Sequence, residues 1–295
     1  MSHLFQNING EVLESSISGI SSSNRSYLYG DGLFESIRVF NGELINLENH
    51  FKRLQEGAVL LKIRLPNYYT EEFFKEKIEE LLQLSKIEKG GRVRLSIDRM
   101  AGGNYTPEFN EATFSIEVKP INSSDFELNS KGLEVDVFTD IKKSRNKLSN
   151  FKTKNGLIYV LSGIHAKEKD LDDMLIINED FGIIESSSSN LFVVSNGVLY
   201  TPGLEDGCLA GTMRMQIINL ALRNGVKVYE SKILPQNLLS ADEVFLTNAI
   251  EGVKWVIGYR TKRYFNNTSR KFVAMLNEFW EKQLEPEDNS LSTDE

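Results

Sequence analysis

The stretch that organises this chain reads Glu185-Ser-Ser-Ser-Ser-Asn190-Leu-Phe192 and continues through Leu199-Tyr-Thr201 to Leu209-Ala-Gly211-Thr-Met-Arg214. It contains two strand-like runs joined by Asn196-Gly197, a dipeptide that tolerates the positive φ angles of a type I′ turn. A carboxylate precedes this hairpin, and Gly211-Thr212 after it begins an apolar-periodic run that predicts a helix. The start of a helix exposes unpaired N–H groups and the positive end of the helix dipole, so it can bind an anion. One hairpin therefore holds an acid and an anion site at a fixed spacing.

The composition predicts a soluble, cytoplasmic protein. Its 295 residues, 40% of them apolar, are enough for a sizeable core and for two domains. The net charge of −8 and the lack of a Lys/Arg run disfavour nucleic acid as a partner. A single cysteine, Cys208, excludes an internal disulfide and suits a reducing compartment. The sequence contains neither an apolar signal segment nor a run of about 18 apolar residues, so we expect no membrane partner.

The N-terminal part of the chain predicts a small α/β domain. Thr70 is a residue type that caps helices, and acidic residues follow it, so a helix begins there. Around Arg92 and Arg94 the polar and apolar residues alternate, which places both arginines on one face of a strand. The predicted elements are a loop at 15–26, helices at 48–62 and from residue 70, and strands at 92–98 and 112–119.

The segment 120–130 is the best candidate for a linker, because it is rich in Ser, Asn and Asp. We therefore divide the chain into a small domain (1–119), this linker, a large domain (131–284) and a disordered acidic tail (285–295). The helix predicted after Asn155 is expected to turn Leu157, Val160, Leu161 and Ile164 inward. The other elements predicted here are strands at 133–138, 174–178, 182–185, 226–230 and 243–247, and helices at 212–223 and 269–282.

Several common catalytic motifs are absent from the sequence. There is no G-x-G-x-x-G, no Walker loop and no G-x-S-x-G, and the three histidines are too scattered to predict a metal site. What remains is a set of lysine, carboxylate, arginine and helix N-terminus. That set is what an enzyme working through a lysine Schiff base needs.

Residues 185–214 resemble the sequence motif of class IV, or fold-type IV, pyridoxal-phosphate aminotransferases. The motif reads Glu185-x-Ser187-x-x-Asn190-Leu-Phe, then Leu199-x-Thr201 and Leu209-x-Gly211-x-x-Arg214. The agreement extends to Gly30-Asp-Gly32-x-Phe-Glu-x-x-Arg38, His50-x-x-Arg53-Leu54, Lys152-x-x-Asn155 and Glu243-Val-Phe, and covers roughly residues 5–280. The resemblance implies a two-domain fold of the α/β (α+β) class, with a small N-terminal domain and a larger C-terminal domain that has a β-barrel-like core.

The resemblance also implies a cofactor, pyridoxal 5′-phosphate, and the residues that hold it. Lys152 would be the catalytic lysine, with Lys154 as a rival two residues away. Glu185 would pair with the pyridine nitrogen and keep it protonated. Arg53 would grip the phosphate bidentately, and backbone N–H groups near the start of the predicted helix would assist. The full predicted set is Lys152, Glu185, Arg53, Ser187, Ser188, Gly211, Thr212, Met213, Asn248 and Ala249.

For the substrate, Arg94 lies on the strand face that in branched-chain enzymes carries an arginine near the substrate carboxylate. Arg38, Tyr27 and Ser36 occupy other pocket positions of the family, although a structural role is an equal alternative for Arg38, Tyr27 and Arg94. Tyr159 is expected to pack on its helix. No metal is expected.

Three functions follow from the resemblance. The first is an aminotransferase that moves the amino group of a branched-chain L- or D-amino acid to a 2-oxo acid. The second is 4-amino-4-deoxychorismate lyase, which releases pyruvate and 4-aminobenzoate, and Ser36, Gly207-Cys-Leu-Ala-Gly and Asn248-Ala249 favour it. The third is a small-molecule-binding relative without chemistry. Family members are homodimers, so a homodimer is expected here.

Overall fold

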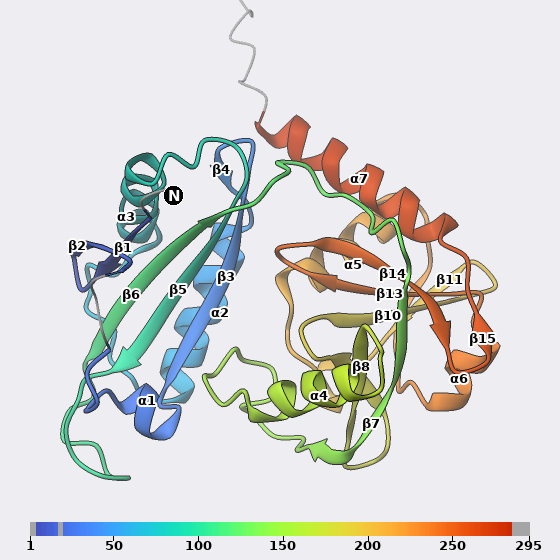
Figure 1. Cartoon of the computed structure of the whole chain (residues 1–295), viewed down its shortest axis with the longest axis horizontal. Coiled ribbons are helices and arrows are strands. Elements are labelled where there is room, and N and C mark those ends of the chain that lie inside the picture. Colours follow the sequence, from blue (N-terminus) through green and yellow to red (C-terminus); the bar gives the residue numbers. More distant parts are fainter. Residues whose placement is uncertain (1–3, 17–19, 285–295) are drawn as a thin grey trace, which may run out of the picture.

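The computed structural model describes residues 4–16 and 20–284 and contains two β-sheets, one in each half of the chain (Figure 1). The acidic tail at 285–295 lies outside the described residues. Within the described part, no helix is long and apolar enough to cross a membrane.

The first sheet is antiparallel and has the strand order β2-β1-β6-β5-β3-β4. Its strands are β1 (Phe5–Ile8), β2 (Glu11–Glu14), β3 (Gly32–Phe40), β4 (Glu43–Leu44), β5 (Gly91–Arg99) and β6 (Ala112–Pro120). Two helices, α2 (Leu47–Leu60) and α3 (Glu71–Leu84), pack on one face of this sheet and bury a common apolar core with it (Figure 1). Thr70 caps α3 as predicted, accepting a hydrogen bond from Phe73 N at 3.1 Å. The predicted helices and long strands of this half are confirmed.

One element of the first half differs from its prediction. The segment 15–26 was expected to be a loop, but helix α1 (Arg25–Tyr29) begins inside it; residues 17–19 lie outside the described part. The side chain of Asn24 accepts hydrogen bonds from Ser26 N and Tyr27 N and so caps α1. Gly30 ends the helix at a φ of 67°, a left-handed conformation that glycine adopts without strain. With only 5 residues, α1 is too short for a periodic pattern to reveal it.

The second sheet closes on itself into a barrel. Strand β9 pairs with β8 on one side and with β10 on the other, which completes the ring β10-β13-β14-β7-β8-β9. The ring strands are β7 (Leu133–Lys143), β8 (Asp173–Asn178), β9 (Ile183–Ser186), β10 (Asn190–Ser195), β13 (Glu243–Asn248) and β14 (Gly252–Tyr259). Three further strands extend it: β11 (Val198–Thr201), β12 (Val228–Glu230) and β15 (Lys262–Arg263). The α/β fold with a barrel-like core is therefore confirmed.

Helices cover the outside of this barrel. Helix α7 (Asn267–Leu284) packs on β14 and on α5 (Thr212–Arg223), and together they bury a second apolar core that includes Phe245 and Phe272 (Figure 1). The predicted end of α5 is confirmed, because Asn224 is its C-cap and Gly225 follows with a φ of 71°. Short elements were missed, namely η1 (Leu204–Asp206), α6 (Pro235–Ser240) and β15, and so was the longer strand β14.

Helix α4 (Leu157–Glu168) exists where it was predicted, but its orientation is reversed. Leu157, Val160, Leu161 and Ile164 were expected to face inward, yet they are 76%, 55%, 41% and 49% exposed. The opposite face, with Ser162 and Ala166, packs against the barrel. Periodicity identified an apolar stripe correctly but could not tell whether this chain or another surface covers it.

The two halves are joined through β3 and through Arg38. Phe34 N donates to Lys152 O at 2.9 Å, and Lys154 N donates to Gly32 O at 3.0 Å, so residues 152–154 run along the edge of β3. The segment between β6 and β7 contains no helix or strand. The guanidinium of Arg38 donates to the carbonyl oxygens of Ser124 at 2.9 Å and Asp125 at 2.6 Å in this segment. The domain limits themselves stay a prediction.

Arg38 also donates to the carbonyl oxygen of Ile250 in the large domain. The residue is buried and its ring neighbour is Phe126, whose centroid lies 4.5 Å from Cζ. Its donors are thus used to hold backbone from the linker and from the β13–β14 turn. This geometry gives Arg38 a structural role at the joint in place of the predicted contact with substrate.

We expect Arg38→Met to lower the free energy of unfolding by about 2 to 4 kcal/mol, because a buried guanidinium is lost and several part-buried carbonyl oxygens lose their donor together. Urea titration followed by circular dichroism measures the change. Arg64→Met is the matched control: its side chain is 70% exposed and pairs only with Glu111, so it should cost less than about 1 kcal/mol. Equal effects of the two variants would contradict this role of Arg38.

Candidate active site

The β10–β11 hairpin forms as the sequence predicts. Asn196 and Gly197 have φ angles of 51° and 73°, as a type I′ turn requires, and Val194 pairs with Leu199. Strand β9 places Glu185 directly opposite Asn190 at the other end of β10. The acid is therefore part of the barrel wall.

Glu185 is buried and accepts three hydrogen bonds. Leu209 N donates to Oε2 at 2.7 Å, while Lys143 Nζ and the Tyr159 hydroxyl donate to Oε1 at 2.6 and 2.9 Å. Lys143 lies at the end of β7 and Tyr159 in the first turn of α4. A carboxylate with this many donors is held in one orientation. Glu185 is therefore an internal acid and does not face water at the end of its strand.

Lys143 and Tyr159 are contacts that sequence reasoning missed. Tyr159 was expected only to pack, but burial and the nearby Glu185 carboxylate raise its pKa, so it stays protonated and donates. Lys143 stands in a basic segment of the sequence with nothing in its spacing to distinguish it from Lys142. Only the pairing of β7 with β8 brings it to Glu185, because β9 lies next to β8.

The loop Leu209–Gly211 connects the acid to Arg53. Its Leu209 N–H binds Glu185, and the carbonyl oxygen of its next residue, Ala210, accepts from Arg53 Nη1 at 2.7 Å. A Cβ on Gly211 would collide with Asn190 Oδ1, so glycine is required where the loop meets the hairpin. Helix α5 begins immediately after, and Gly211 provides no side chain to cap it. No side chain therefore binds the first-turn N–H groups of α5 as a cap, and the predicted anion site there stays a prediction.

Arg53 forms a buried ion cluster with Glu35 and His50. Its Nε lies 2.8 Å from Glu35 Oε1 and its Nη2 lies 2.5 Å from Oε2, while His50 Nδ1 lies 2.7 Å from Oε2. Burial raises the pKa of Glu35, but Arg53 and His50 outweigh it and lower the pKa to about 2. His50 Nε2 is 3.2 Å from the Thr212 hydroxyl, so the cluster reaches the start of α5.

The Nε–Nη2 side of the Arg53 guanidinium binds Glu35, so only its terminal nitrogens have N–H groups left for a phosphate. The predicted role of Arg53 in holding the phosphate stays a prediction. Of the five N–H donors of an arginine, Arg53 uses three within the described residues, on Glu35 and Ala210. Two N–H groups on the terminal nitrogens are left. Within the described residues, Arg53 thus links Glu35 of β3 to the Leu209–Gly211 loop.

Lys152 carries an amine with no hydrogen bond or ion pair to the described part of the chain. Its nearest contact of note is the ring of Phe34, whose centroid lies 4.3 Å from Nζ. Burial and the positive charge of Arg53 lower its pKa to about 8, although Glu35 and Glu185 act in the opposite direction. An amine that is partly neutral near pH 8 can act as a nucleophile and as a proton carrier.

Lys154 is bound elsewhere. Its ammonium forms an ion pair with Asp98 Oδ1, and the same carboxylate accepts from Ser26 Oγ at 2.7 Å and from Asn24 at 3.1 Å. These contacts fix the segment 152–154 against β5 and α1. Of the two rival lysines, Lys152 is the one with a free amine.

The serine turn, residues 187–189, lies next to Glu185 in the chain and contacts Asn248. Asn248 donates to Ser189 Oγ at 3.0 Å, and its own Oδ1 accepts from Ile250 N and Glu251 N. This holds the Asn248-Ala249 turn against the serine turn. Ser187 directs its hydroxyl to Asp173 Oδ1 at 2.5 Å, so that hydroxyl faces β8. Ser188 is exposed, and no hydrogen bond links its side chain to another described residue.

The predicted substrate residues are only partly brought together. Ser36 and Arg94 are register partners on β3 and β5, and Cζ of Arg94 lies 3.8 Å from the Phe34 centroid, the same ring that Lys152 contacts. Tyr27 is 73% exposed on α1. Arg38 is held at the joint between the halves, as described above.

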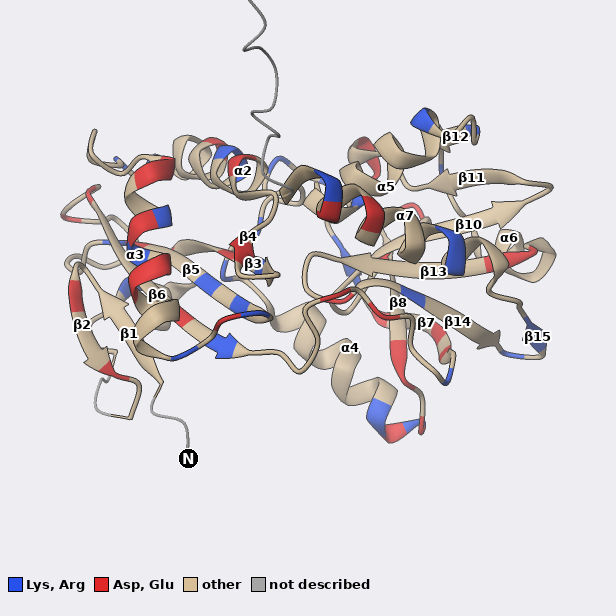
Figure 2. Ribbon diagram, turned by 90° about the horizontal axis from the view of Figure 1, so that it is seen from above, with Lys and Arg blue, Asp and Glu red and all other residues tan. Residues whose placement is uncertain are grey.

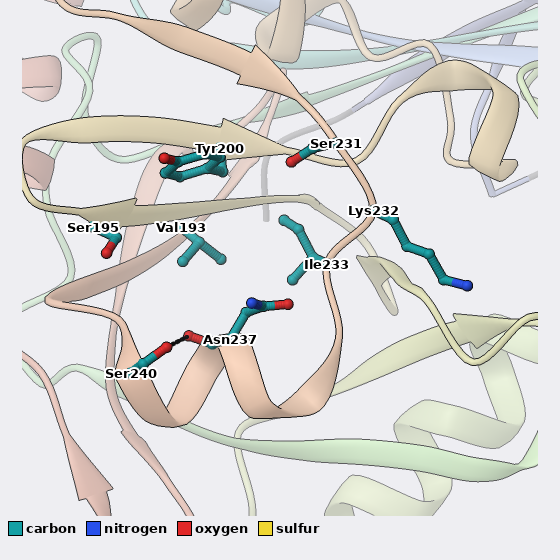
Figure 3. A pocket seen from close by; sticks show the side chains of 8 residues that line it. All are labelled: Val193, Ser195, Tyr200, Ser231, Lys232, Ile233, Asn237 and Ser240. Atoms are coloured by element: carbon teal, nitrogen blue, oxygen red, sulfur yellow. Dashed lines mark hydrogen bonds between the residues drawn. The ribbon is translucent and has the colours of Figure 1, made fainter.

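A separate hollow of about 270 Å³ lies on the large domain, lined by strands β10 and β11, the chain after β12, and α6 (Figure 3). Tyr200, Lys232 and Asn237 are among its lining residues. None of the predicted site residues lines it. It therefore plays no part in the arrangement around Lys152.

Comparisons with known proteins agree with this geometry. Residues 32–256 match the Amino-transferase class IV family. The D-alanine aminotransferase of Bacillus licheniformis is 29% identical over 246 residues, 81% of this chain and 83% of that protein. The aminodeoxychorismate lyase of Vibrio harveyi is 25% identical over 243 residues, 80% and 85% of the two chains. The branched-chain aminotransferase of the archaeon Thermoproteus uzoniensis, solved with norvaline, has a TM-score of 0.86 at 22% identity, covering 96% of each chain.

The chain belongs to the class IV aminotransferase family. The cofactor of this family is pyridoxal 5′-phosphate. The residues present fit that group. A buried carboxylate, Glu185, and an uncapped helix start flank the Leu209–Gly211 loop, and the unpaired amine of Lys152 lies within electrostatic reach of that carboxylate. Among the described residues, the buried hydroxyls of Ser186 and Thr247 have no hydrogen-bond partner.

The lowered pKa of Lys152 can be tested on the cofactor-free protein. Reductive dimethylation followed by mass spectrometry across pH should give a labelling midpoint near pH 8 for Lys152, because only the neutral amine reacts. Below that pH the ammonium form dominates and labelling falls. Lys154 is the internal control, and it should label more slowly at pH 8 because Asp98 holds its ammonium. A Lys152 midpoint at the ordinary lysine value would contradict the burial argument.

Proposed function

We propose that the protein is a pyridoxal-phosphate-dependent aminotransferase that moves the amino group of an amino acid to a 2-oxo acid, with Lys152 as the catalytic lysine. The observation that carries the proposal is the amine of Lys152. The residue is half-buried, and its amine has no hydrogen-bond or ion-pair partner among the described residues. Desolvation and Arg53 lower its pKa to about 8, and the carboxylates of Glu35 and Glu185 lie within its electrostatic reach. A structural lysine in such surroundings would have an ion-pair partner.

When bound, the cofactor supplies an aldehyde that links to an amine and a ring that accepts electron density from the substrate. The chain's own residues do the rest. Lys152 takes and returns the proton at the substrate carbon, for which a pKa near the working pH is best. Glu185 places a carboxylate at one edge of the site, and its three donors keep it in one orientation.

The anion-binding end is assigned to the start of α5. The N–H groups of Thr212 and Met213 point out of a helix that no side chain caps, and the remaining N–H groups of Arg53 add positive charge. We assign the remaining wall of the anion-binding end to the Asn248-Ala249 turn and to the serine turn that contains Ser188. Ser187 has no donor left for the anion, since its backbone N–H and its hydroxyl both donate to Asp173 Oδ1.

A second candidate, 4-amino-4-deoxychorismate lyase, is supported by the similarity to the Vibrio harveyi enzyme. The lyase would need the same lysine and acid. Ser36, which favoured this alternative in the sequence, is buried on β3 in register with Arg94. It can therefore offer a hydroxyl near the same pocket.

We further propose a homodimer, with the apolar stripe of α4 at its interface. Leu157, Val160, Leu161 and Ile164 are exposed together on one helix face, an arrangement that water-exposed helices avoid. Two such stripes can cover each other. Cytoplasmic localisation is retained as part of the proposal, on the observation that Cys208 is free and buried.

The proposed reaction is tested with purified protein loaded with pyridoxal phosphate. Amino transfer from D-alanine, L-leucine and glutamate to a 2-oxo acid is measured beside pyruvate release from 4-amino-4-deoxychorismate. We expect Lys152→Ala to bind the cofactor without a borohydride-reducible link and to lose at least about 1,000-fold in turnover. Lys154→Ala should keep that link. Turnover that survives Lys152→Ala would overturn the assignment, and loss of the link in Lys154→Ala would transfer it to Lys154.

The interface is tested by the pair Val160→Lys and Leu161→Lys introduced together. Two charges in the centre of the stripe should convert a dimer into a monomer in light scattering after size exclusion. Val59→Lys is the control, because Val59 is equally apolar and 78% exposed but lies alone on α2. A dimer that tolerates the double substitution would place the interface elsewhere.

A further inference from the structure

Lys152 lies on a short backbone pairing between the two halves of the chain. Phe34 N donates to Lys152 O at 2.9 Å, and Lys154 N donates to Gly32 O at 3.0 Å, with one antiparallel bridge between these two hydrogen bonds. Side chains on a strand alternate with a period of two. A two-residue shift of 152–154 along β3 would therefore restore the same pattern of hydrogen bonds and the same faces.

The backbone alone does not distinguish the two lysines of this segment. Lys152 and Lys154 are separated by one residue, so their side chains leave the same face. The amine of Lys152 lies 4.3 Å from the centroid of the Phe34 ring. A two-residue shift would place Lys154 opposite Phe34 instead and exchange the two amines. Side-chain contacts therefore decide which lysine is beside the ring.

Asp98 makes the contact that distinguishes the two lysines. It stands opposite Gly32 in the register of β3 with β5, and its carboxylate forms an ion pair with the ammonium of Lys154. A Cβ on Gly32 would collide with Asp98 Oδ1 and with Ser26 Oγ, so glycine is required at this position. Lys154 therefore reaches across β3, above a residue without a side chain, to an acid on the next strand.

The arginines on the strand of Asp98 do not replace Lys154 as its partner. Figure 2 shows basic segments along β5 in blue. Arg94 shares the face of Asp98, but its guanidinium lies over an aromatic ring of β3. Arg99 follows Asp98 directly, but it binds Asp31 at 2.9 Å. Within the described residues, the ion pair of Asp98 is with the lysine from the other half of the chain.

Burial makes this ion pair selective. Asp98 is 6% exposed, Ser26 Oγ donates to its Oδ1 at 2.7 Å, and Asn24 Nδ2 donates to its Oδ2 at 3.1 Å. A shift that moved Lys154 away would leave the buried carboxylate with these neutral donors and no ion-pair partner, which is unfavourable. The register that places Lys154 at Asp98 is therefore favoured.

Lys152 has no comparable acceptor. Two acids, Glu35 and Glu185, lie within electrostatic reach of its amine. Each of them already binds another cation: Arg53 Nε is 2.8 Å from Glu35 Oε1, and Lys143 Nζ is 2.6 Å from Glu185 Oε1. Among the described residues no carboxylate forms an ion pair with Lys152, so its amine stays free beside the ring.

We propose that Asp98 is a positioning residue that decides which lysine of the segment 152–154 reacts. Its ion pair with Lys154 fixes the register on β3 and keeps that ammonium away from the ring of Phe34. Lys152 alone then presents a free amine there. Asp98 acts through Lys154 and is not itself a catalytic residue. This inference rests on the proposed function, in which one lysine links to the cofactor.

A gain of function tests this role. Lys152→Ala alone is expected to carry no borohydride-reducible link to the cofactor. Adding Asp98→Asn should restore a link, now at Lys154, in at least about a tenth of the chains, because the uncharged amide releases the ammonium. Borohydride reduction, digestion and tandem mass spectrometry locate the link. A loss of stability cannot create a new link, so a merely structural role of Asp98 would not give this result.

Asp31→Asn is the matched control. Asp31 is also little exposed, but its carboxylate accepts from Arg25 and Arg99 and from no lysine among the described residues. Lys152→Ala combined with Asp31→Asn should therefore carry no link. If the protein with Lys152→Ala and Asp98→Asn binds the cofactor and still has no link at Lys154, the inference is wrong.

Asp98→Asn alone provides a second measurement, which does not need the cofactor. Reductive dimethylation of the cofactor-free protein at pH 8 should label Lys154 at least about 3-fold faster than in the unsubstituted protein, because the carboxylate no longer holds its ammonium. An unchanged rate would contradict the inference.

The position of the link in the unsubstituted protein separates the two ways of failing. A link at Lys152, together with no effect of Asp98→Asn on Lys154 in either measurement, removes the role of Asp98 and leaves the proposed function intact. Absence of any link in the unsubstituted protein, or a link at Lys154, would instead overturn the proposed function with Lys152 as its catalytic lysine.

Discussion

The loop Leu209–Gly211 is fixed by hydrogen bonds from both halves of the chain, and the geometry of the candidate site depends on these two hydrogen bonds. From the barrel, Glu185 accepts from Leu209 N, and from the small domain, Arg53 donates to Ala210 O. The second contact forms only when the two halves meet. The acid, the arginine and the start of α5 are therefore positioned by one short piece of backbone, and the distance between the two ends of the site is set by three residues of loop.

Charge decides the chemistry of the site more than shape does. Arg53 is balanced by Glu35, which the pair of Arg53 and His50 keeps ionised to about pH 2. Lys152 receives no such partner, so burial and Arg53 lower its pKa to about 8. Lys152 and Lys154 are only two residues apart, yet their ammonium groups differ in their partners. Asp98 forms an ion pair with Lys154, and no described carboxylate forms one with Lys152.

Much of the fold could be predicted because its long elements carry strong local patterns. The alternation of 92–98, the cap at Thr70 and the Asn196-Gly197 turn are local features, and the structure contains each of them. The errors have physical reasons. Helix α1 is too short for a period to appear, and α4 carries an apolar stripe whose cover is not part of this chain's own core. Arg38 matched a pocket position by its spacing, yet its donors are used on backbone carbonyls at the joint.

The sequence by itself determined the family, the barrel-containing fold, the cofactor and the hairpin that carries Glu185, because these follow from contiguous residues and from a motif of fixed spacing. Only the tertiary structure decided which groups surround those residues. Lys143 and Tyr159 reach Glu185 through strand pairing and helix packing, and Glu35 takes the forked side of Arg53 through the contact of β3 with α2. Such contacts join residues that are far apart in the chain. Their energies depend on how deeply the groups are buried and on which hydrogen-bond partners are close to them. No local pattern in the sequence encodes either quantity.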